Sequence, residues 1–162
     1  MLLHAPKPMP EEILLVASSG GHLLELMQLA DLWPQERRRW VTFPTTDAVP
    51  LLAGEQTTWA HHPTNRNPGN LIRNFGLALR TVRRRDVQAI VTTGAGVAVP
   101  FAIVARLKGV KVVYIESMAR ITSPSLTGRL IYPFADTFIV QWPGLQRFFR
   151  RAQMFGTVFD PS

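Results

Sequence analysis

Cysteine is absent from this 162-residue chain, so disulfide bonds, thiolate metal sites and a cysteine nucleophile are excluded. Acidic residues are scarce: 11 of them stand against 18 Lys and Arg, which gives a formal net charge of +7. Such a surface attracts phosphate groups, whether they belong to nucleic acid, to anionic lipid or to a phosphorylated substrate. The charge alone does not choose among these three partners.

Long apolar segments are also lacking. The longest uncharged stretch, residues 89–105, falls short of the ~20 apolar residues that a membrane-spanning helix needs, and Gly94, Gly96 and Pro100 interrupt it. Residues 1–10 contain no apolar core of the kind that marks a signal peptide. We therefore expect a cytoplasmic protein whose contact with a membrane, on its inner face, is peripheral.

Short apolar runs alternate with helical patterns along the whole chain, which we treat as one domain, residues 1–162. The strands are predicted at residues 12–17, 39–43, 57–61, 89–92, 110–115 and 137–140. The helices are predicted at residues 22–32, 47–53, 70–84, 97–108, 124–134 and 144–151. This alternation predicts an α/β fold with a doubly wound, mostly parallel sheet, which is Rossmann-like. Ligands of such folds bind at the carboxyl ends of the strands.

A glycine pair follows the first predicted strand, in the run Ser18-Ser19-Gly20-Gly21-His22. Backbone N–H groups of such a turn can approach an anion closely, and a helix that starts there adds a partial positive charge. We expect a phosphate or diphosphate at Ser19, Gly20 and Gly21, with His22 as a base or a phosphate ligand. A plain strand-to-helix turn, in which Ser18 or Ser19 caps the helix, fits the same pattern.

Two other classes of protein fit the pattern less well. A stand-alone nucleotide-dependent Rossmann enzyme is disfavoured because G-x-G-x-x-G is absent and the second strand ends in Phe43-Pro44-Thr45, without an acidic residue for a ribose. A basic nucleic-acid-binding module is disfavoured because no stacking-aromatic motif is present. His4, His61 and His62 lack ligand-like spacing with carboxylates, so we predict no metal site.

Two later strands also end in residues that can form a site. Gly94 and Gly96 follow the fourth strand, where small residues allow a ligand or the first loop to approach the sheet, although plain packing explains them equally well. Glu116 and Ser117 follow the fifth strand, and Arg120 lies just beyond them. A single carboxylate at this place is as often solvated as functional. Ser123, placed before Pro124, is typical of a helix start.

The predicted helix at residues 70–84 has two faces. One face is apolar and includes Leu71 and Leu79, and the other carries Arg73, Arg80 and Arg84. Arginines of this kind are typical of a solvated face, and they also suit an anionic membrane surface.

Four segments together resemble a known family. They are SSGGHLLEL (residues 18–26), TTGAGVAVPF (92–101), YIES (114–117) and SLTGRLIYPFADTFIVQWPGL (125–145). Their order and spacing resemble the membrane-recruiting subunit of the two-part N-acetylglucosaminyltransferase of dolichol-linked oligosaccharide assembly, the fourteenth member of the asparagine-linked glycosylation series. Bacterial PssD-type polysaccharide glycosyltransferases are similar, and so is the amino-terminal domain of MurG. The resemblance covers residues 13–159.

The resemblance implies the amino-terminal, acceptor-binding half of a GT-B glycosyltransferase. Such an enzyme transfers a sugar, with inversion and without a metal or other cofactor, from a nucleoside-diphosphate sugar such as a UDP-sugar to a lipid-diphosphate-linked sugar. His22 and Glu116 take the catalytic roles, and both are expected to face an open cleft. Because the sequence stops at Ser162, where a donor-binding domain would begin, we expect that domain in a separate partner subunit. It also lacks the amino-terminal membrane helix of the eukaryotic subunit.

Overall fold

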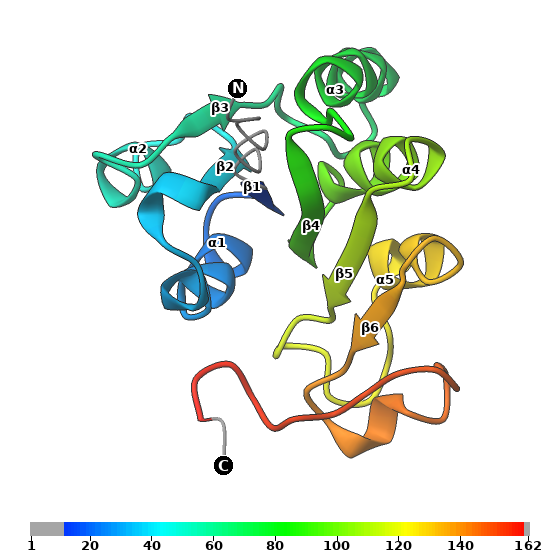
Figure 1. Ribbon diagram of the computed structural model, residues 1–162. Coiled ribbons are helices and arrows are strands. Elements are labelled where there is room, and N and C mark those ends of the chain that lie inside the picture. The colour runs from blue at the N-terminus through cyan, green and yellow to red at the C-terminus, as the bar shows by residue number, and fades with distance from the viewer. Residues whose placement is uncertain (1–11, 161–162) are drawn as a thin grey trace, which may run out of the picture.

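The computed structural model describes residues 12–160, which form one six-stranded sheet between helices (Figure 1). The strands are β1 (Glu12–Ala17), β2 (Arg38–Thr42), β3 (Thr57–Trp59), β4 (Val87–Gly94), β5 (Lys111–Ile115) and β6 (Thr137–Ile139). Their order in the sheet is β3-β2-β1-β4-β5-β6, and every neighbouring pair is parallel. This confirms the expected doubly wound fold, with β1 and β4 at its centre.

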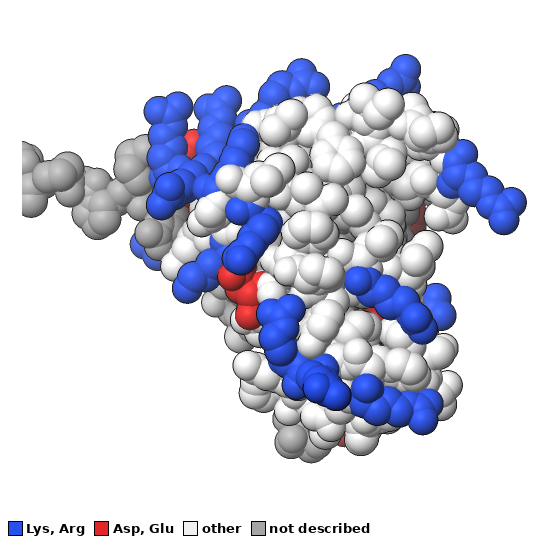
Figure 2. Space-filling view, turned by 90° about the vertical axis from the view of Figure 1, so that its right-hand side faces the viewer, with Lys and Arg blue, Asp and Glu red and all other residues white. Residues whose placement is uncertain are grey.

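Helices cover both faces of the sheet. α1 (Gly21–Met27) and α2 (Ala48–Leu51) lie on one face, and α3 (Pro68–Thr81), α4 (Ala98–Leu107) and α5 (Leu126–Ile131) lie on the other (Figure 1). Successive side chains of β1 alternate between two apolar layers, so that Leu15 packs with the first group and Leu14 with the second. The outer face of α3, α4 and α5 carries Lys and Arg around an uncharged area (Figure 2).

Three predicted helices differ from those observed. The helix predicted at residues 22–32 is split into α1 and the 3-10 turn η1 (Ala30–Leu32), because the amide of Leu29 bonds to Leu26 three residues back and tightens the chain. The helix predicted at residues 70–84 already ends at Thr81, since Val82 is extended. At residues 144–151 only the 3-10 turn η3 (Pro143–Leu145) forms, because the chain turns back to pair Gln153 with the end of β6.

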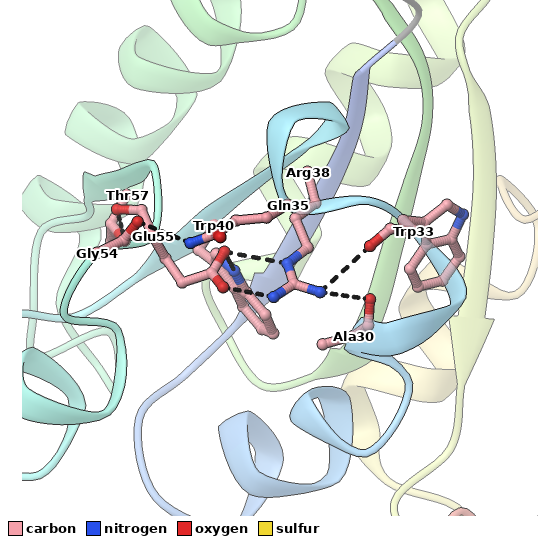
Figure 3. A network of polar contacts seen from close by, with 8 residues as sticks. All are labelled: Ala30, Trp33, Gln35, Arg38, Trp40, Gly54, Glu55 and Thr57. Atoms are coloured by element: carbon pink, nitrogen blue, oxygen red, sulfur yellow. Dashed lines mark hydrogen bonds and ion pairs between the residues drawn. The ribbon is translucent and has the colours of Figure 1, made fainter.

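A polar network fastens the amino end of β2, on the far side from the carboxyl ends of the strands (Figure 3). The guanidinium of Arg38 donates to Glu55 at 3.0 Å, and the indole of Trp40 donates to the same carboxylate at 2.9 Å. Arg38 also donates to the backbone oxygens of Ala30, the first residue of η1, and of Trp33, which lies between η1 and the 3-10 turn η2 (Gln35–Arg37). The hydrogen bond from Arg38 is the main cause that holds the pKa of Glu55 below its ordinary value. These contacts join the start of β2 to η1 and to the segment before β3.

Membrane-related expectations can be compared with the structure in part. No helix within residues 12–160 has both the length and the apolar character to cross a membrane. Residues 1–10, where we expect no signal peptide, lie outside the described part of the chain. His4, which was considered as a metal ligand, is one of these residues.

Candidate active site

A cleft of about 1020 Å³ opens at the carboxyl ends of the strands, where a doubly wound fold binds its ligand. Four of the residues proposed from the sequence line it: Ser19, His22, Gly96 and Arg120. They come from three segments of the chain, which follow β1, β4 and β5. The fold therefore brings together a histidine, a hydroxyl group and a guanidinium that lie up to 101 positions apart in the chain. No Asp or Glu is among the described residues that line the cleft.

The ring of His22 is held in one orientation. Its Nδ1 lies 2.8 Å from the backbone oxygen of Thr93, and the hydroxyl of Thr93 donates back to the backbone oxygen of His22 at 2.6 Å. A carbonyl oxygen only accepts, so Nδ1 carries the hydrogen and the neutral ring has its lone pair on Nε2. This is the tautomer that a general base facing the cleft needs.

The first glycine turn differs from the expected phosphate loop. Gly20 has a φ of +79°, which favours glycine, and its amide donates to the carboxylate of Asp47 at 3.1 Å. Neither Ser18 nor Ser19 caps α1 with its side chain, so the alternative of a serine cap is wrong. The pKa of Asp47 is lowered, first by the neighbouring polar side chain of Thr45. Contact of Gly20 and Gly21 with a phosphate remains a prediction.

The second glycine turn allows two close approaches. Gly94 has a φ of +107°, and a Cβ there would lie 2.9 Å from the phenol oxygen of Tyr114. A Cβ on Gly96 would lie 2.9 Å from Oγ1 and 3.0 Å from Cβ of Thr64. The small residues at this turn therefore admit the side chain of Tyr114 and the loop after β3, where the sequence suggested a ligand or the first loop.

Glu116 is fully buried, so the expectation that its side chain faces an open cleft is wrong. Its carboxylate accepts hydrogen bonds from the phenol of Tyr114 at 3.1 Å, from the hydroxyl of Ser125 at 2.8 Å and from the amides of Ser117 and Ser125. Burial first, and the charge of Glu116 second, raise the pKa of Tyr114 far above its ordinary value, so the phenol stays a donor. Ser125, and not Ser123, caps α5 through its side chain.

Sequence reasoning missed a second buried carboxylate, Glu25. It accepts from the hydroxyl of Ser117 at 2.8 Å, from the amide of Met118 and from the side chain of Gln141 at 3.1 Å. Through these bonds α1, which carries His22, is joined to the segment that leads to Arg120. A single Glu on an amphipathic helix is normally exposed, so the sequence carried no signal for its burial.

Sequence reasoning also missed the loop between β3 and α3, residues 60–67, as part of the candidate site. His62, Thr64 and Arg66 of this loop line the cleft, together with Phe43 and Thr45 after β2. Its Pro and Asn residues are typical of a loop, and its place after a strand of the same parallel sheet was the signal that could have assigned it to the edge where the cleft opens.

The arginines proposed for a membrane surface lie in different settings. Arg73 and Arg80 are exposed on α3, next to exposed Ile72 and Leu79. Leu71 and Leu79, predicted on the apolar face of this helix, are both exposed, because the buried face is formed by Asn70, Asn74 and Ala78. Arg84 lies beyond the end of the helix, with its side chain beside Gly109.

Within residues 12–160, no group of three or more His, Asp and Glu is arranged to hold a metal ion. Whether the reaction needs a metal is a separate question, and its metal independence stays a prediction.

Known proteins share both the sequence pattern and the fold. The family described as "Oligosaccharide biosynthesis protein Alg14 like" matches residues 61–158. The UDP-N-acetylglucosamine transferase subunit ALG14 of Eremothecium gossypii is 30% identical over 92% of this chain and 80% of its own length. The human protein of the same name is 26% identical over 90% of this chain and 82% of its own length.

The solved structure of MurG from Acinetobacter baumannii has the same fold, with a TM-score of 0.69 and 21% identity. That match covers 83% of this chain and 43% of MurG, so this chain spans less than half of the MurG chain. A family match across more than half of the sequence, and a fungal relative aligned over nearly all of it, lead to one conclusion: the chain belongs to the Alg14 family.

Proposed function

We propose that this chain is the acceptor-binding subunit of a split glycosyltransferase, which transfers a sugar from a UDP-sugar to a lipid-diphosphate-linked sugar. The observation that carries the proposal is the cleft at the carboxyl ends of the strands, which is lined by an oriented His22 and by Arg66 and Arg120, and by no carboxylate of the described residues. A cleft with this charge suits an anionic substrate. UDP-N-acetylglucosamine is the first donor to test, because the relatives are named as subunits of a transferase for that nucleotide sugar.

His22 is the proposed general base. The attacking hydroxyl of the acceptor sugar forms a bond to the anomeric carbon of the donor, while the bond from that carbon to the nucleotide diphosphate breaks. The hydroxyl proton goes to Nε2 of His22, which the hydrogen bond at Nδ1 leaves as the acceptor. A single displacement of this kind inverts the configuration of the anomeric carbon.

Glu116 takes a positioning role in this proposal, because its carboxylate is buried and accepts from several donors at once. It holds Ser117 and the start of α5, and so fixes the segment that carries Arg120. Ser19 and Arg120 are then the candidates for direct contact with the acceptor, since both line the cleft.

A partner subunit would supply the donor-binding half. Two observations support this part of the proposal: the relatives are named as subunits, and the MurG chain is more than twice as long as the part that this chain matches. The charge of the leaving nucleotide would be stabilised by the partner.

The surface over α3, α4 and α5 is the proposed contact with an anionic membrane. Basic side chains surround an uncharged area on this face (Figure 2), and α3 exposes Ile72 and Leu79 beside Arg73 and Arg80. Apolar residues that insert among lipids, with arginines at the phosphate level, suit binding to an anionic bilayer.

The proposal is tested by His22→Ala in the complex of this chain with its donor-binding subunit, assayed with UDP-N-acetylglucosamine and a lipid-diphosphate acceptor. Loss of a general base lowers turnover by about a hundredfold or more. Leu24→Ala, an exposed position on the same helix, is the matched control and should retain the normal rate. A melting curve for each variant shows that the fold is intact. Near-normal turnover of folded His22→Ala would remove His22 from the mechanism.

A further inference from the structure

The loop at residues 60–67 is fixed to α3 by two asparagine side chains. Asn74 is fully buried, and its amide group both donates to the backbone oxygen of His61 and accepts from its backbone N–H, each at 2.9 Å. Asn70 donates to the backbone oxygen of Pro63 at 2.9 Å. Polar residues therefore occupy the buried face of α3 because they hold this loop in place.

The other side of the loop lies against the turn after β4. Thr64 sits so close to Gly96 that a methyl group at that glycine would collide with it. The loop is thus confined between α3 and the β4–α4 turn, and its tip stands at the cleft. A loop held from two sides can present a side chain in a fixed place.

Arg66 is at that tip, and its backbone has a φ of +51°, which is uncommon for a residue other than glycine. Such backbone persists where the surroundings impose it, and it concentrates at ligand-binding positions. Arg66 lines the cleft, and so does Arg120 from the β5–α5 segment; both residues are exposed. Neither guanidinium forms a salt bridge with a carboxylate within residues 12–160.

Apolar side chains continue the same cleft. Leu71, Val99, Leu126 and Leu130 line it, and Leu126 is 72% exposed. Several exposed apolar side chains that line one cleft form the kind of surface that marks a ligand-binding groove. The cleft therefore combines two charged groups for phosphates with an apolar wall for a hydrocarbon chain.

We propose that Arg66 and Arg120 together bind the two phosphates of a lipid diphosphate, whose hydrocarbon chain lies along Leu126 and Leu130. The inference rests on the proposed function and assigns the lipid end of the acceptor to particular residues. Guanidinium groups bind phosphate oxygens through paired charge-assisted hydrogen bonds. Loss of either arginine therefore weakens the binding of the diphosphate directly.

Calorimetric titration of the full chain with three probes tests this inference: farnesyl diphosphate, inorganic pyrophosphate and UDP. Farnesyl diphosphate should bind most tightly, because it alone offers both a diphosphate and a hydrocarbon chain. Arg66→Ala and Arg120→Ala should each lower the affinity for farnesyl diphosphate by about tenfold or more, because each removes a charged hydrogen-bonding partner. Arg37→Ala, which removes an exposed arginine outside the cleft, should not.

A separate variant tests the apolar side chains of the cleft. Leu126→Ser should lower the affinity for farnesyl diphosphate by about tenfold, because one leucine contact is lost. The affinity for pyrophosphate should stay unchanged. UDP binding that is as tight as that of farnesyl diphosphate and equally sensitive to Arg66→Ala would overturn the lipid assignment in favour of a nucleotide. Equal affinity of Arg66→Ala and the unmodified chain for farnesyl diphosphate would contradict the proposed role of the arginine pair.

Failure of this inference and failure of the proposed function give different results. If the assembled complex transfers sugar at a normal rate and KM with Arg66→Ala but not with His22→Ala, the arginine pair is wrong and the transferase stands. If farnesyl diphosphate binding depends on both arginines while the complex transfers no sugar, the diphosphate site stands and the proposed reaction is wrong.

Discussion

At the scale of single residues, the two buried carboxylates have a different task from the histidine. His22 has one ring nitrogen hydrogen-bonded to the backbone oxygen of Thr93 and lines the cleft, which fits its proposed role as general base. Glu116 and Glu25 are buried and accept hydrogen bonds from groups that lie after β5. They fix the positions of their neighbours, and their removal should be felt first in stability.

Glu116→Gln should lower the free energy of unfolding by about 1–3 kcal/mol, because the new amide NH₂ would face hydroxyl and amide donors that need an acceptor. Urea denaturation measures the change. Glu36→Gln, at an exposed position, is the control and should stay within about 0.5 kcal/mol of the unmodified chain. An unchanged unfolding curve together with lost activity would assign Glu116 a direct catalytic role instead.

At the scale of elements, the cleft is shaped by how closely its loops approach one another. The turn after β4 can lie against the loop of residues 60–67 only because Gly96 has no side chain. The same loop is held from α3 by Asn70 and Asn74.

Gly96→Ala should therefore cost about 1–3 kcal/mol of stability, as overpacking does, and should displace the loop that carries Arg66. Thr64→Gly in the same chain removes the colliding atoms and should restore much of the loss. Gly76→Ala, on α3 with open space around it, should be neutral or slightly stabilising. Thermal and urea unfolding compare the three. Full stability of Gly96→Ala would show that the close approach to Thr64 does not matter.

The sequence was sufficient to predict the parallel sheet, and the cleft opens at the edge where a ligand was expected, because buried strands and their following turns have clear patterns. Asn70 and Asn74 show where this reasoning stops: their partners are backbone groups of a loop, and no periodicity reveals such contacts. The helix predicted at residues 144–151 failed for a related reason, since the pairing of Gln153 with the end of β6 depends on tertiary structure. His22 could be predicted to lie at the cleft because it stands at the start of the helix that follows β1, whereas Arg66 lies inside an irregular loop.

At the scale of the whole molecule, the face over α3, α4 and α5 carries Lys and Arg side chains around an uncharged area (Figure 2), and α3 exposes apolar side chains there. The same side of the sheet carries α5, whose Leu126 and Leu130 line the cleft. A membrane bound there would deliver a lipid acceptor to the cleft.

Binding to vesicles that contain anionic lipid should exceed binding to neutral vesicles and should weaken as salt is added. Arg73→Ala and Arg80→Ala should each reduce binding by about fivefold, which corresponds to ~1 kcal/mol for each arginine near the surface. Arg37→Ala carries the same loss of charge on the η2 turn and should have little effect. Sedimentation with vesicles measures all four proteins. Equal losses in all three variants would show that only net charge matters.

We propose that this chain holds the acceptor and completes the reaction only with a donor-binding subunit. The most direct measurement compares initial rates of sugar transfer from UDP-N-acetylglucosamine to a lipid-diphosphate acceptor, for the purified chain alone and for the chain combined with the subunit that co-purifies with it from its native cell. The account predicts transfer by the pair and none above background by the chain alone. Sustained turnover by the isolated chain would contradict it.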